Sequence, residues 1–373
     1  MKRLACGRTV TRRGFLKAAA AGALAVSGAR AGPADQRNRR FSATDRKQAL
    51  AWQAASRKLL LELMALGDLV EADRPARGRP GIALKPAVTS TRAEEDYTLY
   101  ELGLSSTPAR RIGAILTVPK AANRRKCPAV VCIHGHGGNR RTPYAPSGAY
   151  RGFGLALAKR GFVTISTDVG QHKVYEKGRT LMGERLWDVM RCVTCLTTRP
   201  EVDAKRIGCA GLSLGGEMAM WLGAMDTRLA ATVSSGFLTT VANMRRGHCP
   251  CWEFPHLTEN FDFADIYSLI APRPLCCQNG RKERAGGGFP VAVAEKAMKQ
   301  IQACYAVFGR SDSARLVVHD EGHVIDLTSC LAFLDKHLGR KEDRQARQIG
   351  TRRSARDPGR LRGARIHPAA RSA

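Results

Sequence analysis

The chain has 373 residues, which is enough for one large domain with a sizeable core and flanking segments. Its hydrophobic content of 44% is ordinary for a soluble protein, and no segment is apolar for long enough to be a permanent transmembrane helix. The net charge of +29 is extreme, but residues 1–50 carry +10 of it and residues 340–373 carry +8. Most of the excess therefore lies in the two terminal segments.

Residues 1–31 have the pattern of a twin-arginine signal peptide. Arg12 and Arg13 are followed by the weakly apolar run 18–26, and Ala29-Arg30-Ala31 offers a small-x-small cleavage site. The alternative is a basic disordered arm with an alanine-rich helix. We expect the twin-arginine export machinery to recognise this segment, which predicts a periplasmic or extracellular protein.

Residues 32–80 are predicted to form a linker and an amphipathic helix. Residues 32–50 are polar and rich in arginine, and residues 45–69 carry apolar side chains at helical spacing. The prolines between residues 75 and 86 end this pattern.

Residues 81–339 alternate between strand-like and helix-like segments. Helical patterns cover residues 152–159, 183–197 and 217–225, and the predicted strands are 97–102, 111–118, 128–133, 161–168, 206–210, 229–235, 274–278 and 315–318. This alternation predicts an α/β fold with a mostly parallel central sheet and helices on both faces. Residues 236–267 interrupt it and are predicted to be a lid-like insertion or one wall of a pocket.

The most informative motif is Gly211-Leu212-Ser213-Leu214-Gly215, between a predicted strand and a predicted helix. A serine in this pattern is typical of a nucleophile elbow, a tight turn that requires small neighbours. A serine hydroxyl needs a base, and the base needs a group that orients it. We predict Ser213 as the nucleophile and His323, in the loop after the last strand, as the base.

The acid of such a triad is predicted to be Glu283, which follows the strand before the last one. The order nucleophile, acid and histidine is that of the α/β-hydrolase triad. A surface salt bridge is the alternative role for Glu283, and Asp262 and Asp265 are alternative acids. His319 is an alternative base, but it ends a strand rather than lying in a loop.

Two backbone N–H groups are expected to form the oxyanion hole. One belongs to Leu214, directly after the nucleophile, and the other to His136 in the glycine-rich loop after residues 128–133. The side chains of His134 and His136 give only a weak metal signal, and we expect neither a metal nor a cofactor. His134, Asp168, Gln171 and His172 are further candidates for the pocket, since strand ends at the carboxyl edge of a parallel sheet bind ligands.

Twelve cysteines are present, several of them within predicted core strands, where cysteine behaves as a small hydrophobic residue. The dense segment His248-Cys249-Pro250-Cys251 could supply half of a metal site, but no second pair of ligands has the usual spacing. Packing or one disulfide is therefore the interpretation that the sequence favours.

Residues 340–373 are basic and have almost no large apolar side chains, so we expect a disordered tail. Its arginines could contact anionic surfaces, although a merely solvated tail is the simpler interpretation. No aromatic residues are interleaved with the arginines, which argues against a specific nucleic-acid partner.

Between residues 97 and 338 the chain resembles the α/β-hydrolase superfamily. It looks most like the acetyl-xylan-esterase and dienelactone-hydrolase-like group, which is related to prolyl-oligopeptidase-type catalytic domains. The stretches that carry the resemblance are residues 134–138, 199–203, 206–208, 211–216, 270–274 and 321–323. It implies Ser213, Glu283 and His323 as the triad and no cofactor. The group usually has aspartate where this chain has Glu283.

These observations predict an exported serine carboxyl-ester hydrolase that works through an acyl-enzyme. A small-molecule or carbohydrate ester is the expected substrate, with acetyl on a polysaccharide as one possibility. A serine peptidase or a dienelactone-type lactone hydrolase would share the same triad. A non-catalytic hydrolase-fold binding protein is the alternative from another class, and the intact serine and histidine argue against it.

Overall fold

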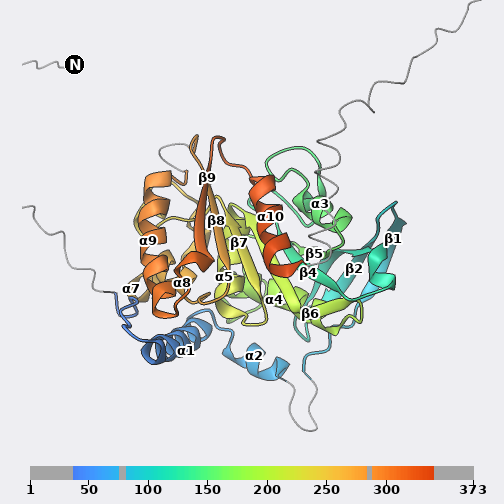
Figure 1. Ribbon diagram of the computed structural model, residues 1–373. Helices are drawn as coiled ribbons and strands as arrows, with labels where there is room; N and C mark the ends of the chain where they lie inside the picture. Colours follow the sequence, from blue (N-terminus) through green and yellow to red (C-terminus); the bar gives the residue numbers. More distant parts are fainter. Residues whose placement is uncertain (1–36, 75–80, 284–287, 340–373) are drawn as a thin grey trace, which may run out of the picture. The chain divides into compact units, whose positions relative to one another are not determined.

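The computed structural model describes residues 37–74, 81–283 and 288–339. The predicted signal peptide and basic tail lie outside the described residues. The described residues form one nine-stranded sheet in the order β1-β2-β3-β5-β4-β6-β7-β8-β9 (Figure 1). The strands are β1 (Ala87–Ala93), β2 (Tyr97–Ser105), β3 (Arg111–Pro119), β4 (Cys127–Ile133), β5 (Val163–Thr167), β6 (Val202–Leu212), β7 (Ala231–Ser235), β8 (Leu275–Gly280) and β9 (Ala314–His319).

The pairing of neighbouring strands changes once across the sheet, from antiparallel to parallel. Neighbouring strands from β1 to β5 pair antiparallel, and all neighbours from β5 through β4 to β9 pair parallel. The predicted α/β fold with a mostly parallel sheet is therefore confirmed. The carboxyl ends of the six parallel strands lie along one edge of this sheet, which is where such folds place their ligands.

Helices cover both faces of the parallel strands (Figure 1). The helices are α1 (Arg46–Leu63), α2 (Gly67–Asp73), α3 (Phe153–Lys159), α4 (Leu181–Thr198), α5 (Leu214–Met225), α6 (Val241–Met244), α7 (Leu257–Asn260), α8 (Phe263–Ser268), α9 (Val291–Val307) and α10 (Leu327–Leu338). Successive β4 side chains alternate between two apolar clusters. Val130 and Cys132 pack in the cluster that holds α3 and α10, and Ala129 and Val131 pack in the one that holds α4, α5 and α9.

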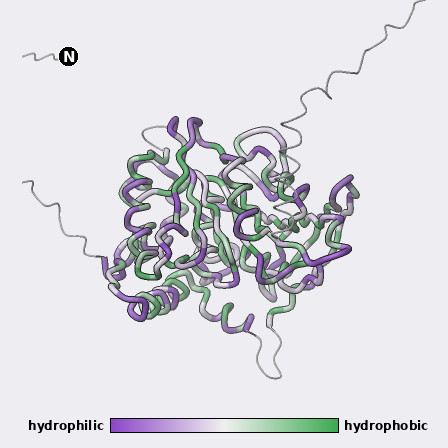
Figure 2. The backbone as a smooth tube through the Cα atoms, viewed as in Figure 1, coloured by the Kyte–Doolittle hydropathy of each residue, from purple (hydrophilic) through white to green (hydrophobic). Residues whose placement is uncertain are grey.

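Because both faces are covered, β4 and β8 are buried along their whole lengths. Figure 2 shows hydrophobic residues along the central strands and hydrophilic residues gathered on the outer helices and loops. Among the described residues, no helix combines the length and the apolar character that a membrane crossing requires.

The helix predicted over residues 45–69 is in fact two helices, and that prediction was wrong in its extent. α1 ends in a Schellman motif: the N–H of Ala65 donates to the carbonyl of Glu62, and the N–H of Leu66 donates to that of Leu61. Ala65 takes a left-handed φ of 54° in place of the usual glycine, so no sequence signal marked the break. The buried side chain of Leu66 stabilises this turn.

Sequence periodicity missed β1 and the helices α9 and α10. All seven residues of β1 are exposed, so this edge strand has no alternation of apolar and polar side chains to reveal it. α9 and α10 flank β9 and complete the covering of the last parallel strands.

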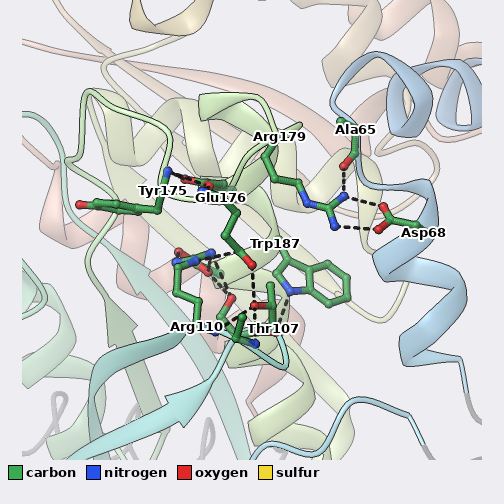
Figure 3. Close-up of polar contacts among 12 residues, drawn as sticks. Ala65, Asp68, Thr107, Arg110, Tyr175, Glu176, Arg179 and Trp187 are labelled. Carbon is green, nitrogen blue, oxygen red and sulfur yellow. Dashed lines mark hydrogen bonds and ion pairs between the residues drawn. The ribbon is translucent and has the colours of Figure 1, made fainter.

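Arg110, in the turn between β2 and β3, forms a buried ion pair with Asp188 on α4 and also binds Glu176 in the segment between β5 and α4 (Figure 3). Arg110 donates to both carboxylate oxygens of Asp188 at 2.8 and 2.7 Å and to Glu176 at 3.1 Å. Thr107 also donates to Glu176, and Arg179 donates to Asp68. Burial raises the pKa of Asp188, and the hydrogen bonds from Arg110 partly offset that effect.

We predict that Arg110→Leu lowers the free energy of unfolding by about 3–5 kcal/mol, because it leaves the buried Asp188 carboxylate without its partner. Thermal or denaturant unfolding measures the loss. Arg92→Leu is the matched control: its exposed ion pair with Glu94 is worth at most about 1 kcal/mol. Equal, small losses in the two variants would contradict a stabilising role for the Arg110 pair.

Candidate active site

Three of the sequence-predicted residues meet at the carboxyl edge of the parallel strands. Ser213 directly follows β6, Glu283 lies three residues after β8, and His323 lies four residues after β9. All three line one cavity of about 540 Å³. The sequence separates Ser213 from His323 by 110 positions, but β6 and β9 belong to the same run of parallel strands, with β7 and β8 between them, so both residues follow strands that end at the same edge of the sheet.

Ser213 occupies a strained backbone conformation, with φ 63° and ψ −125°. Residues other than glycine rarely adopt a positive φ, and such strain persists only where the surroundings enforce it. Here β6 reverses directly into α5, and the backbone passes so closely that a Cβ on Gly211 would lie 2.2 Å from the carbonyl oxygen of Gly215. A Cβ on Gly215 would in turn lie 2.3 Å from the carbonyl oxygen of Ile133. The turn therefore has the nucleophile-elbow geometry that the motif predicts.

His323 and Glu283 form the second part of the arrangement. The imidazole Nδ1 lies 2.8 Å from Glu283 Oε1, and the Glu283 side chain is only 4% exposed. The ring of Phe289 stacks on the imidazole, with centroids 5.5 Å apart and an interplanar angle of 16°. The N–H of Phe289 also donates to Glu283 Oε2 at 3.4 Å. Because Nδ1 is engaged with the carboxylate, Nε2 is left as the nitrogen that can accept a proton.

The alternative acids and base serve other purposes. Asp262 caps α8 and accepts from the N–H of Val241, and Asp265 is paired with Arg37. Neither carboxylate lines the cavity, and neither does His319, which is the last residue of β9. Of the acids considered from the sequence, the structure brings Glu283 to the histidine.

Leu214 and His136 line the same cavity as the serine. Leu214 is the first residue of the twelve-residue helix α5, where backbone N–H groups have no partner within the helix and favour negative charge. In the glycine-rich loop after β4, the N–H of Gly135 donates to the hydroxyl of Tyr150, and the N–H of Gly138 donates to the carbonyl of Gly135. The N–H groups of Gly135 and Gly138 are thus engaged in local contacts, whereas His136, which lies between them in the sequence, lines the cavity.

His134 and Asp168 do not line this cavity. His134 is fully buried, and its Nε2 accepts from the N–H of Val169 at 3.0 Å while Nδ1 lies 2.8 Å from the carbonyl of Gly135. Burial lowers the pKa of His134, in keeping with a neutral ring that links the ends of β4 and β5. Asp168 accepts from Arg140, and together with Gln171 it lines a separate cavity of about 720 Å³.

His172 also stays outside the residues that line the cavity, but its ring centroid lies 5.4 Å from that of His136. The inserted segment 236–267, by contrast, forms one wall of the cavity. It contributes Phe237, Met244, Gly247, His248, Cys249 and Cys251.

Sequence reasoning missed Glu217 and Phe289 as cavity residues. Glu217 is one helical turn after Ser213 on α5, and this spacing could have placed it on the same face. Burial raises the pKa of Glu217 to about 7, which the nearby Arg185 partly offsets. Its Oε1 has no hydrogen-bond partner in the described part of the chain. The carboxyl group therefore keeps its proton up to near-neutral pH.

Comparisons with known proteins agree with this geometry. Residues 81–246 match the model of the acetyl xylan esterase (AXE1) family. The protein named "Putative hydrolase YtaP" of Bacillus subtilis (strain 168) is 29% identical over 316 residues, which cover 77% of this chain and 100% of YtaP.

Solved structures give the same fold. The methylesterase BT1017 has a TM-score of 0.63 at 19% identity, over 79% of this chain and 65% of that protein. A glucuronoyl esterase from Solibacter usitatus has a TM-score of 0.59 at 19% identity, over 82% of this chain and 98% of that protein. The predicted resemblance to the α/β hydrolases and their acetyl-xylan-esterase group is therefore confirmed: the solved structures share the fold, and the family match and YtaP support a carboxylic ester hydrolase.

Proposed function

We propose that the protein is an exported serine esterase that removes small acyl groups from carbohydrate esters. The observation that carries the proposal is the hydrogen bond between His323 and the buried Glu283, in a cavity shared with a serine on a strained turn. A nucleophile, a base and a group that orients the base are the three parts of serine-hydrolase chemistry. An acyl-enzyme mechanism accounts for all three.

In the first half-reaction, the Ser213 oxygen attacks the ester carbonyl carbon and His323 Nε2 accepts the hydroxyl proton. The N–H groups of Leu214 and His136 stabilise the oxyanion, and His323 then gives the proton to the departing alcohol. In the second half-reaction, His323 takes a proton from water, and the water oxygen attacks the acyl carbon. The bond between that carbon and the Ser213 oxygen then breaks, the acid leaves, and His323 returns the proton to Ser213. The Glu283 carboxylate accepts the hydrogen bond from the Nδ1–H group of His323 and stabilises the imidazolium.

The acyl and alcohol parts of the ester share one cavity of about 540 Å³, which α5 bounds on one side. The aromatic rings of Phe237, Phe289 and His248 line this cavity. The family match to acetyl xylan esterases points to acetyl as the acyl group and a polysaccharide as the alcohol. A panel of acetylated xylan oligosaccharides, methyl glucuronate esters and peptide anilides separates this substrate from those of other serine hydrolases.

We predict that Ser213→Ala lowers kcat for acetyl ester hydrolysis by about 10⁴-fold or more, since no other group in the cavity replaces the nucleophile. Initial rates with 4-nitrophenyl acetate and with an acetylated xylan oligosaccharide measure it. Ser311→Ala, at an exposed serine far from the cavity, is the matched control and should keep the wild-type rate. Retention of the wild-type rate by Ser213→Ala would refute the mechanism.

For Glu283→Gln we expect kcat to fall about 10²–10⁴-fold with little change in KM, because the amide keeps its size but cannot stabilise the imidazolium. Glu321→Gln changes a carboxylate two residues from His323 that instead pairs with Arg151 on the surface, and its kcat should stay near wild type. Equal rates for the two variants would show that Glu283 does not orient the base.

Export is part of the proposal because Arg12 and Arg13 precede an apolar run and a cleavage pattern. Cell fractionation should find the wild type outside the cytoplasm and the double variant Arg12→Lys/Arg13→Lys inside it. The control Arg3→Lys/Arg8→Lys keeps the same net charge and the arginine pair, and should be exported. Export of both variants alike would contradict twin-arginine transport.

A further inference from the structure

Four side chains from three separate segments converge beside the serine cavity. His136 lies in the loop after β4, His172 in the segment after β5, and Cys249 and Cys251 around the short 3₁₀ helix Pro250–Trp252 of the inserted segment. One imidazole nitrogen or sulfur atom from each residue lies within 4.8 Å of the others. His136 Nε2 is 3.1 Å from Cys251 Sγ, and His172 Nε2 is 3.4 Å from Cys249 Sγ.

Two of these separations are close to the edge lengths of a coordination tetrahedron. With zinc–sulfur bonds of about 2.3 Å and zinc–nitrogen bonds of about 2.0–2.1 Å, the edges of a regular tetrahedron are about 3.3–3.8 Å. The two measured nitrogen–sulfur distances lie at or just below this range. The remaining pairs of ligand atoms lie within 4.8 Å of one another, about 1 Å beyond the longest of these edges.

The four ligand groups favour one kind of metal ion over others. Two thiols and two imidazoles form the Cys₂His₂ set that favours Zn²⁺, whereas Mg²⁺ and Ca²⁺ prefer oxygen ligands, of which this cluster has none. Four protein ligands also fill a tetrahedral site completely and leave no position open for a reacting water. A closed site of this kind holds segments together.

A buried arginine already braces two of the three segments. The guanidinium of Arg185 on α4 donates to the carbonyl of Cys251 at 3.4 Å and to the carbonyl of Gln171, the residue before His172. Farther along the second segment, Glu176 is held by Thr107 and Arg110 (Figure 3). Next to Cys251, the side chain of Trp252 is 2% exposed. These contacts hold the backbone next to Cys251 and His172 in place, which lowers the entropic cost of binding an ion.

We propose that His136, His172, Cys249 and Cys251 bind one Zn²⁺ ion in a closed structural site. The ion would tie the loop of His136 to the segment after β5 and to the wall formed by the insertion. The site goes beyond the proposed hydrolysis, in which no metal takes part. Through His136 it would fix the loop whose N–H is the proposed second oxyanion donor, so loss of zinc should lower kcat without preventing covalent labelling of Ser213.

The test uses the full chain purified under reducing conditions, equilibrated with ZnSO₄ and freed of excess metal. Elemental analysis should then find about one zinc per chain. Single variants Cys249→Ser, Cys251→Ser and His172→Ala should lose most of it. His256→Ala removes an exposed histidine that pairs with Glu259, and should retain the full content.

Cobalt substitution of the wild type gives a second readout that does not depend on whether the variants fold. Tetrahedral Co²⁺ with two thiolate ligands should give visible ligand-field bands and a near-ultraviolet charge-transfer band, which Cys249→Ser shifts and His256→Ala leaves unchanged. Wild type that holds no zinc and shows no such bands would overturn the proposal. So would a Cys249–Cys251 disulfide that forms in preference to metal binding when both thiols start reduced and zinc is present. Fluorophosphonate labelling of Ser213 in the same samples separates failure of this proposal from failure of the hydrolase mechanism.

Discussion

The reversal of the chain between β6 and α5 is the constraint on which the rest of the site depends. A strand that ends at Leu212 and a helix that begins at Leu214 leave one residue for the turn, and that residue must accept a positive φ. The cost of this conformation, of order 1–3 kcal/mol, is offset by the packing of residues 207–212 of β6, all of which are buried, and of α5, which is buried throughout. As a result of this turn, the side chain of Ser213 lies at the edge of the sheet, beside the N-terminus of α5. Small residues at positions 211 and 215 follow from this geometry.

The positions of His323 and Glu283, the proposed base and acid, depend on a second close approach. A Cβ on Gly280, at the end of β8, would lie 2.3 Å from the carbonyl oxygens of both Glu321 and Gly322. This contact lets the loop after β9 lie directly against the end of β8, and it places His323 within hydrogen-bonding distance of Glu283. The Glu283 side chain is almost completely buried, and the N–H of Phe289 donates to its second carboxylate oxygen.

The fold and the triad could be predicted from the sequence because both leave local signals. Buried parallel strands appear as short apolar runs, and the elbow appears as glycines around a serine. Glu283 and His323 could be placed because the order of strands fixes where a loop lies. The exposed edge strand β1 leaves no such signal, and neither does Ala65 in a left-handed turn. The structure confirms the predicted fold, while the catalytic roles of Ser213, Glu283 and His323 stay predictions until they are measured.

The cluster at the cavity rim lies beyond sequence reasoning for a different reason. Cys249 and Cys251 are close in sequence, but their partners His136 and His172 lie in the segments that follow β4 and β5. Metal-ligand motifs are recognised by short spacing, and here only the order of strands in the sheet supplies the second pair. The same holds for Arg185, whose buried guanidinium braces two segments that are far apart in the chain.

The proposed function requires that Ser213, in the turn between β6 and α5, be an activated nucleophile. The most direct test is intact-mass spectrometry after treatment with a fluorophosphonate, followed by peptide mapping of the adduct. The account predicts a single adduct on Ser213 that is absent from Ser213→Ala. No adduct on the folded wild type, or an adduct on another residue, would contradict it.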